Sequence, residues 1–412
     1  MKSQERLIIF LLAAINFTHI LDFMIMMPLG NYLMPYFNIS PGKFSILVGA
    51  YTLTAAVSGF VAAFFVDNYD RKKILIYAFV GFLIGTLACG LAPSYSLLVL
   101  ARILAGLFGG LIGAQVLAII SDIFGYERRG MAMGAVMSSF AIASTLGVPF
   151  ALYLANAISW HAPFILVGVL GIGLIPLLVK YIPEMKEHVQ DKGSSKLKIL
   201  REVIHNPKQV WALIFSSSIM LGHFLIIPFV NPFLEFNMGF AKSLTPIVYL
   251  VGGISAFVAS FVLGRMSDSK GKLIIFTYSV LASAVMVLVI TNMPHVPFPV
   301  VLVFFGLWFT VATGRAVTAQ AMLSNVPPPA QRGSFMSFNS SVQQIGTSIA
   351  SFLSGLIVIQ ATDSKLLRYD WVGYVSVFVL IGSLMLARWL FKGLDEEVAV
   401  SEASLVKKIV TS

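Results

Sequence analysis

Long apolar segments alternate with short polar segments along the chain. About 20 apolar residues are enough for a helix to cross the hydrocarbon core of a bilayer. Twelve segments reach that length, near residues 7–34, 44–66, 74–92, 97–121, 131–156, 160–181, 209–235, 243–266, 273–292, 297–325, 334–360 and 370–391. Their apolar runs are continuous, unlike the alternating pattern of membrane β-strands. The pattern predicts an all-α integral membrane protein with twelve transmembrane helices.

The longest polar stretch, residues 182–208, divides the twelve segments into six and six. Within it, Leu197, Leu200, Val203 and Ile204 share one helical face, which predicts a short amphipathic helix at the membrane surface. A regulatory partner site is the alternative interpretation of this segment. The predicted units are an N-terminal six-helix bundle, a cytoplasmic linker, a C-terminal six-helix bundle and a cytoplasmic tail, at residues 1–181, 182–208, 209–392 and 393–412.

The composition supports this assignment. Of 412 residues, 58% are hydrophobic and 11% are charged, with a mean hydropathy of +0.89. Soluble domains average about 45–50% apolar and about 25% charged residues, so a soluble protein is excluded. Cys89 is the one cysteine, so the chain has no intramolecular disulfide, and we expect no metal site or cofactor.

Lysine and arginine residues are unevenly divided between the two sides of the predicted helices. Of the 28 lysine and arginine residues, 22 lie on the side that carries both termini. Arg102 and Arg315 lie within helices, and the other side has Lys43, Lys242, Lys365 and Arg368. Such a bias marks the cytoplasmic side. We therefore expect cytoplasmic termini in a bacterial inner membrane. The net charge of +10 reflects this orientation, and no nucleic-acid partner is expected.

The two halves contain matching landmarks. Residues 27–31 and 227–231 both place proline three residues before asparagine, at an offset of 200. An Arg-Gly pair recurs at 129–130 and 332–333. These matches predict a parallel repeat with a substrate site near the membrane midplane; chance similarity between apolar segments is the alternative.

Two loops carry a common pattern of acid, glycine and basic residues. Residues 264–272 carry one copy, and residues 63–73 carry a second that departs from it, with Ala63 and Asp70 in place of glycines and Asn68 in the basic position. Both resemble the G-x-x-x-D-[RK]-x-G-[RK]-[RK] loop of the major facilitator superfamily. The matching positions are Asp67, Arg71, Lys72, Gly264, Asp268, Gly271 and Lys272.

These loops have a physical rationale as a conformational latch. An acid at a helix end can cap the N-terminus of a neighbouring helix. The adjacent bases can pair with Asp122 at the end of the fourth predicted helix. Such contacts would hold the cytoplasmic side in one conformation and release it in the other. The alternative is that the loops set orientation alone.

Three further motifs resemble the proton-coupled branches of this superfamily. Residues 102–106 are similar to its R-x-x-x-G motif, residues 147–149 to a shortened glycine–proline motif of drug/proton antiporters, and residues 339–346 to the arabinose and sugar-efflux branch. The resemblance implies proton-coupled efflux. Small residues also permit close helix packing, and the positions assigned to packing are Gly106, Gly110, Gly147 and Pro149.

Ionisable side chains within lipid are costly and mark functional sites. At 1.5 Å per residue, Asp22 and Arg102 both lie about 8 Å below the outer face of a core of about 30 Å. Burial favours the neutral acid, whereas a neighbouring guanidinium favours the carboxylate. We therefore expect Asp22 to carry the proton and Arg102 to be its switch partner, with a static ion pair as the alternative. His19, one turn away, is either a relay or a hydrogen-bonded core residue.

Polar side chains on the first, seventh, tenth and eleventh predicted helices are candidates for substrate binding. In a two-fold bundle these helices line the cavity, although polar groups also join helices to one another. Arg315 suits an anionic or hydroxylated group, with a structural bond to helix carbonyls as the alternative. The candidates are Asn16, Thr18, His223, Asn231, Arg315, Asn339, Gln343 and Gln344.

Enzyme chemistry finds no support, since the sequence lacks a Walker motif, a nucleophile elbow and a dinucleotide fingerprint. We predict a monomeric secondary transporter that exports a small organic solute, such as a sugar or drug, in exchange for protons. Proton-linked uptake and a transporter-like solute sensor are the alternatives.

Overall fold

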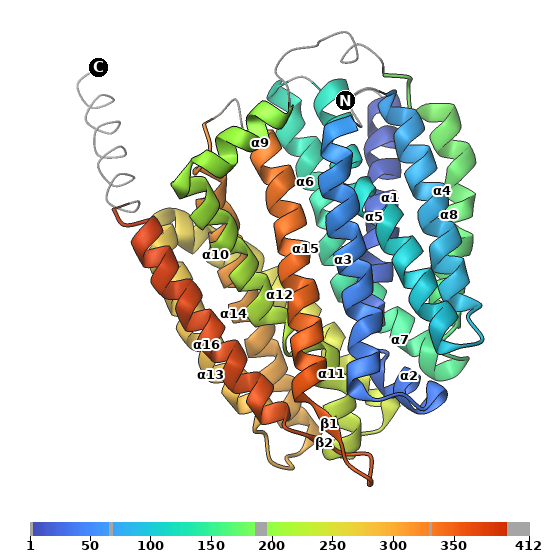
Figure 1. Ribbon diagram of the computed structural model, residues 1–412, viewed down its shortest axis with the longest axis vertical. Helices are drawn as coiled ribbons and strands as arrows, with labels where there is room; N and C mark the ends of the chain where they lie inside the picture. Colours follow the sequence, from blue (N-terminus) through green and yellow to red (C-terminus); the bar gives the residue numbers. More distant parts are fainter. Residues whose placement is uncertain (1–2, 66–68, 125, 186–195, 329–331, 394–412) are drawn as a thin grey trace.

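The computed structural model describes residues 3–65, 69–124, 126–185, 196–328 and 332–393. Long helices run side by side along the long axis of the molecule (Figure 1). The first half contains α1 (Ser3–Met26), α2 (Gly30–Phe37), α3 (Pro41–Phe65), α4 (Arg71–Gly90), α5 (Tyr95–Ile123), α6 (Tyr126–Ile142), the π-helix η2 (Ala143–Gly147), α7 (Val148–Ala157) and α8 (Ala162–Tyr181).

The second half repeats this order after the helix α9 (Lys196–His205). It contains α10 (Pro207–Phe224), α11 (Ile227–Pro232), the π-helix η4 (Phe233–Asn237), the 3-10 helix η5 (Lys242–Leu244), α12 (Thr245–Lys270), α13 (Lys272–Thr291), α14 (Phe298–Ser324), α15 (Arg332–Ile357), β1 (Ile359–Gln360), β2 (Leu366–Leu367) and α16 (Tyr369–Leu390).

Within the described residues, 11 helices are long and apolar enough to cross a membrane. The remaining predicted span corresponds to α15, which has 26 residues but is rich in serine, asparagine and glutamine. It packs between α3 and α10, so its polar face meets other helices rather than lipid (Figure 1). The predicted all-α membrane fold is confirmed.

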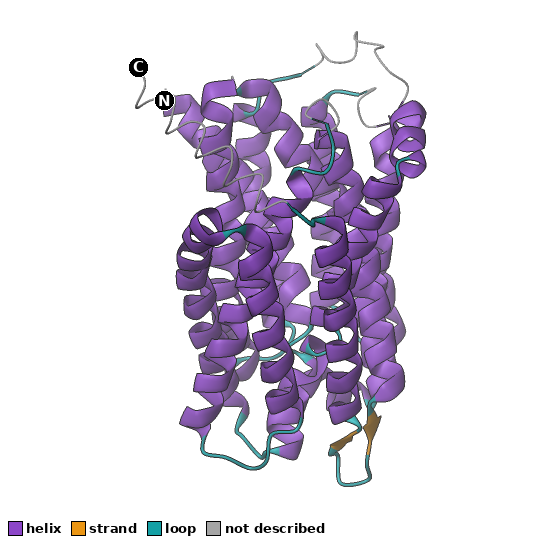
Figure 2. Cartoon of the chain, turned by 90° about the vertical axis from the view of Figure 1, so that its left-hand side faces the viewer, coloured by secondary structure: helices purple, strands orange, loops and turns teal. Residues whose placement is uncertain are grey.

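The helices have two distinct ends. We call the end that carries α2, α11 and the strands β1 and β2 the hairpin end, and the end that carries α9 and the start of α1 the linker end (Figure 1). Figure 2 shows the same arrangement from the side, with the β1–β2 hairpin projecting beyond the helices. Both halves span the full distance between these ends.

Three predicted spans are not single α-helices. The first breaks at residues 27–29 because Pro28 lacks an amide hydrogen and clashes with the preceding turn. The seventh breaks just before Pro228, and η4 extends it. The fifth contains η2 immediately before Val148. The first and seventh spans break at the hairpin end, where hydrogen bonds join the two halves.

The short hairpin β1–β2 was not predicted from the sequence. Ile359 pairs with Leu367, and Gln360 with Leu366, in antiparallel register. The Asn237 side chain fixes it to η4, since its Nδ2 donates to the Leu366 carbonyl at 2.8 Å and its Oδ1 accepts from the Leu366 amide at 2.9 Å.

The helix α9 lies in the segment for which the sequence predicts an amphipathic helix. Val203 is 1% exposed, and α9 packs on α3 and α10. Ile204 is 59% exposed, so the neighbouring helices bury Val203 but leave Ile204 of the predicted apolar face exposed. The side chains of Leu197 and Leu200 lie outside the described residues.

Close packing of α5 on α3 depends on glycine. A Cβ at Gly106 would collide with the Tyr51 carbonyl, and a Cβ at Gly110 would collide with the Ala55 carbonyl. The two helices therefore approach each other backbone to backbone. The same α3 packs on its other side against α15, so it is shared between the two halves.

Gly106→Ala should lower stability by about 1–3 kcal/mol, because the added methyl group forces α5 away from α3. Gly113→Ala on the same helix is the matched control, since its added Cβ would meet nothing within 4 Å. Thermal unfolding of both variants in detergent measures the effect. Equal unfolding temperatures for the two would contradict the packing role of Gly106.

Candidate functional site

An ion pair between α1 and α5 lies at the centre of the first half. Arg102 Nη1 donates to Asp22 Oδ2 at 2.8 Å, and the two residues are fully buried. The Arg102 guanidinium also lies over the Tyr51 ring of α3, 4.2 Å from its centroid. Three helices thus meet at one pair of opposite charges.

This pair leaves much of its hydrogen-bonding capacity unused. Asp22 Oδ1, Arg102 Nε and Nη2, and the Tyr51 hydroxyl are buried without a hydrogen-bond partner. A buried charge is stable when its geometry and remaining hydrogen bonds are satisfied. Asp22 and Arg102 are therefore held together mainly by their mutual attraction, with little support from other groups.

His19 lies one turn from Asp22 on α1. Its ring contacts Phe82 and Tyr51, with centroid distances of 5.8 and 6.5 Å. A Cβ on Gly109 would lie 3.2 Å from His19 Nε2, so a larger residue there would press on the imidazole. Neither ring nitrogen has a hydrogen-bond partner. His19 thus lies beside the ion pair without bonding to it.

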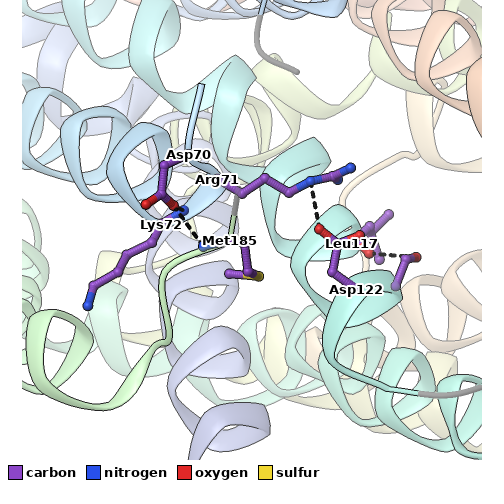
Figure 3. Close-up of polar contacts among 7 residues, drawn as sticks. Asp70, Arg71, Lys72, Leu117, Asp122 and Met185 are labelled. Carbon is purple, nitrogen blue, oxygen red and sulfur yellow. Dashed lines mark hydrogen bonds and ion pairs between the residues drawn. The ribbon is translucent and has the colours of Figure 1, made fainter. Parts of the chain in front are cut away.

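At the linker end, polar contacts tie α4 to its neighbours (Figure 3). The Asp70 carboxylate accepts from the Lys72 amide at 2.9 Å and the Met185 amide at 3.2 Å, so it caps α4 and holds the start of the linker. Arg71 Nε lies 2.9 Å from Asp122 Oδ2 at the end of α5. Asp67, the acid of the sequence motif, lies outside the described residues.

The corresponding loop of the second half is arranged differently. Lys272 Nζ lies 3.5 Å from Asp268 Oδ1. Asp268 is near the end of α12, and Lys272 begins α13 four residues later. Asp268 is 75% exposed, so this ion pair adds little stability. Gly271 joins α12 to α13 with φ +102°, a conformation that favours glycine. Gly264 lies one turn before Asp268 in α12.

Hydrogen bonds join the two halves at the hairpin end. Asn31 Nδ2 donates to Glu235 Oε2 at 2.6 Å, and Asn231 Nδ2 donates to the Pro28 carbonyl at 2.7 Å. These asparagines are the repeat landmarks, and each occupies the short helix that follows a break. Lys242 strengthens the contact because its Nζ lies 3.5 Å from Glu235 Oε1.

A third hydrogen bond joins α3 to α15. Ser348 Oγ donates to the Gly49 carbonyl at 2.9 Å, two residues from Tyr51. Among the described residues, these three hydrogen bonds are the ones that join the two halves. All three lie in the hairpin-end part of the molecule. At the linker end, the described bonds of Asp70 and Arg71 stay within the first half or its linker.

Four predicted substrate residues make hydrogen bonds within the protein. Asn16 Nδ2 donates to Ser139 Oγ at 2.8 Å, and Gln343 Nε2 donates to Ser216 Oγ at 2.8 Å. Thr18 bonds to a carbonyl of its own helix. Asn231 joins the two halves, as described above. Asn16, Gln343 and Asn231 therefore join different segments in this conformation, whereas Thr18 bonds within α1.

The other candidates retain free hydrogen-bonding groups. Nδ1 of His223, Nε and Nη1 of Arg315, and Oδ1 of Asn339 are buried without a partner. Gln344 is half-buried on α15. These residues lie on α10, α14 and α15 in the second half, whereas the Asp22–Arg102 pair lies in the first.

The glycine–proline motif of the fifth span lies where that span bends. Gly147 ends η2, and a Cβ on it would lie 2.9 Å from Leu21 Cδ1. Pro149 is buried at the start of α7. The motif thus places the bend directly against α1, one residue from Asp22.

Sequence reasoning did not identify Tyr51, Asp70 or Glu235. A tyrosine in an apolar helix gives no sign that it covers a charge, and Asp70 was noted as a departure from a motif. Glu235 lies at the end of an apolar segment, opposite Asn31. The repeated asparagines were the available signal, because symmetry places equivalent positions of both halves near one axis.

Comparisons with known proteins agree with this architecture. The sequence matches the Major Facilitator Superfamily over residues 12–318. It is 24% identical over 338 residues to the uncharacterized MFS-type transporter YceJ of Bacillus subtilis (strain 168), covering 82% of this chain and 85% of that protein. A probable sugar efflux transporter of Haemophilus influenzae (strain PittGG) is 21% identical over 257 residues, 62% of this chain and 64% of that protein.

A solved structure has the same fold. It is a bacterial homologue of the human lysosomal transporter Spinster, in an inward-facing and occupied conformation, with a TM-score of 0.73 at 15% identity. The match covers 95% of this chain and 97% of that one. The prediction of a transporter rather than an enzyme is confirmed. With a family match over most of its length and this fold, the chain belongs to the major facilitator superfamily.

Proposed function

We propose that this transporter couples proton movement to the export of a small organic solute. The two halves, residues 1–181 and 209–392, would move against each other and expose a central site to each side in turn. The observation that carries the proposal is the Asp22–Arg102 ion pair, which is fully buried in the first half. Charged residues at such depth are rare and usually functional.

Protonation of Asp22 supplies the coupling step. A neutral acid no longer attracts Arg102, and an unpaired buried guanidinium is strongly unfavourable. The protonated protein therefore favours a conformation in which Arg102 finds other partners. Tyr51 already offers its ring to the guanidinium at 4.2 Å. Loss of the proton restores the attraction and the starting conformation.

Tyr51 links this event to the interface between the halves. It lies on α3, two residues from Gly49, whose carbonyl accepts the hydrogen bond of Ser348 on α15. Movement of Arg102 away from Asp22 displaces the Tyr51 ring that it covers. The same displacement acts on α3 where it contacts the second half. His19, packed against Tyr51, is proposed to tune this step.

The conformation described here is held at the hairpin end. Export requires these contacts to separate while the linker end closes. We propose that Arg71, Asp122 and the neighbouring loop residues latch the linker end during this cycle. From the bias of basic residues, we place the linker end and both termini in the cytoplasm of a bacterial cell, with the protein in its inner membrane.

We propose a sugar or related organic solute as the substrate. The name of the Haemophilus influenzae relative, a probable sugar efflux transporter, supports export of a sugar. Asn339, Gln344 and His223 have hydrogen-bonding groups suited to hydroxyl-rich solutes. The chain would act as a monomer, because each half contributes to one site between them. Uptake with protons is the alternative direction of coupling.

Asp22→Asn should abolish solute-dependent proton release, because the amide cannot exchange a proton. The measurement uses inside-out vesicles with an acid interior and a trapped pH-sensitive dye, to which sugars and cationic drugs are added in turn. Wild-type vesicles should release protons with at least one compound. Asp363→Asn is the control, since Asp363 lies on the exposed hairpin and pairs with Lys365.

Undiminished proton release in Asp22→Asn would contradict the carrier role and leave a static ion pair. Proton entry in the opposite sense, with solute moving alongside protons, would establish uptake instead of export.

A short reducible cross-linker with two methanethiosulfonate groups, joining Asn31→Cys to Glu235→Cys, should stop transport. The native side chains bond at 2.6 Å across the two halves, so the cross-link would hold the hairpin end closed. Solute flux should return when a reductant is added. Cys89 is buried and leaves the engineered pair undisturbed.

Each single cysteine variant controls for loss of the native side chain. Equal solute flux in the double variant with the cross-link in place and after its reduction would show that the hairpin end does not need to open.

A further inference from the structure

Arg315 is a buried cation that forms no ion pair with another described residue. It lies on α14, is 2% exposed, and its Nε and Nη1 atoms have no hydrogen-bond partner. At 1.5 Å per residue, it lies about 14 Å from the linker end of α14, close to the middle of a hydrocarbon core of about 30 Å. Nothing in the ion-pair mechanism of the first half uses this residue.

Three acids of the second half pair with lysines, and a fourth, Asp370, lies in the first turn of α16 at the hairpin end. Among the described residues, its ion pairs are Glu235–Lys242, Asp268–Lys272 and Asp363–Lys365. No described carboxylate pairs with Arg315. Arg102, in contrast, is equally buried and has Asp22 at 2.8 Å. The two buried arginines of the bundle thus differ in one respect, the presence of an anion.

Small apolar residues lie next to Arg315 along its own helix. Ala312 and Ala319 lie one turn before and one turn after it on the buried face of α14, and each places a single methyl group beside it. Trp308 lies two turns before it on the same face. An apolar wall with small residues next to a charge is typical of a pocket rather than of a satisfied ion pair.

Hydrogen-bonding groups also come from α10, which packs against both α14 and α15, and from α15. His223 of α10 lies against Trp308, with ring centroids 5.5 Å apart, and within electrostatic range of Arg315. On α15, Asn339 is 2% exposed and its Oδ1 has no partner. Its distance from the linker end of α15, about 11 Å, is similar to the depth of Arg315. Groups from α10, α14 and α15 therefore reach the same level of the bundle.

We propose that Arg315 binds an anionic group of the transported solute, a carboxylate or a phosphate. A guanidinium presents two parallel N–H donors that match either group. The apolar face toward Trp308 would take the carbon skeleton, and Asn339 would bond its hydroxyl groups. This inference rests on the proposed transport function and narrows its substrate class to organic acids, including acidic sugars.

The stability of the empty protein tests whether Arg315 lacks a counterion. Arg315→Gln should raise the unfolding temperature by about 2 °C or more, because it removes an unpaired buried charge. Arg102→Gln is the matched control and should lower the unfolding temperature, since it leaves Asp22 buried and alone. A fall in both variants would show that Arg315 has a structural partner and would overturn the proposal.

Ligand binding tests the chemistry directly. Purified protein in detergent is heated with gluconate, glucuronate or glucose 6-phosphate, and with glucose as the neutral analogue. At least one anion should raise the unfolding temperature of the wild type by more than glucose does, and this gain should vanish in Arg315→Gln. Comparing the gain with gluconate or glucuronate to the gain with glucose 6-phosphate shows whether the site recognises a carboxylate or a phosphate.

An equal response to glucose and all three anions, or a gain that persists in Arg315→Gln, would overturn the proposal. The readout is independent of proton coupling, because it needs no membrane and no gradient. Asp22→Asn should retain the anion-dependent gain. If no proton release is seen in vesicles, the anion-dependent gain in unfolding temperature would still stand. If the anion-dependent gain is missing, proton release in vesicles would still stand.

Discussion

The cost of burying charge inside a membrane protein governs this structure. Asp22 and Arg102 remain buried because each supplies the charge that the other requires. Their position then constrains three helices: α1 and α5 must lie close enough for a 2.8 Å contact, and Tyr51 of α3 must cover the guanidinium. The glycines that let α5 approach α3 serve the same constraint.

Such a pair is well suited to a switch because one proton changes its energy greatly. At the hairpin end, three hydrogen bonds join the two halves beside apolar contacts such as Phe44 against Phe229. Individual hydrogen bonds of this kind contribute about 0.5–1.5 kcal/mol each. A change in the ionisation of one buried carboxylate is large enough to outweigh them, which gives the coupling a plausible energy scale.

Much of the architecture follows from the sequence. Apolar length predicts the long helices, and α9 lies where the periodicity predicts a short helix. The breaks near Pro28 and Pro228 are not predicted, because a membrane helix can also contain proline without breaking. The two-residue strands are not predicted because they depend on the contact with Asn237 of η4. Depth along two helices predicts that Asp22 and Arg102 come within reach. The rotation of each helix about its own axis decides which neighbours a polar residue such as Asn16 or Gln343 contacts. A single sequence does not specify this rotation.

The central claim, that Asp22 gains and loses a proton during the transport cycle, is most directly tested by infrared difference spectroscopy. Spectra of purified protein would be recorded across a pH titration, with Asp22→Asn as the reference. The account predicts a carbonyl stretching band of a protonated carboxyl group that appears on acidification and is missing in Asp22→Asn. It also predicts that cross-linking residues 31 and 235 moves this band to lower pH, because the locked conformation keeps Arg102 beside the carboxylate. Identical bands in the wild type and Asp22→Asn at every pH would contradict the account.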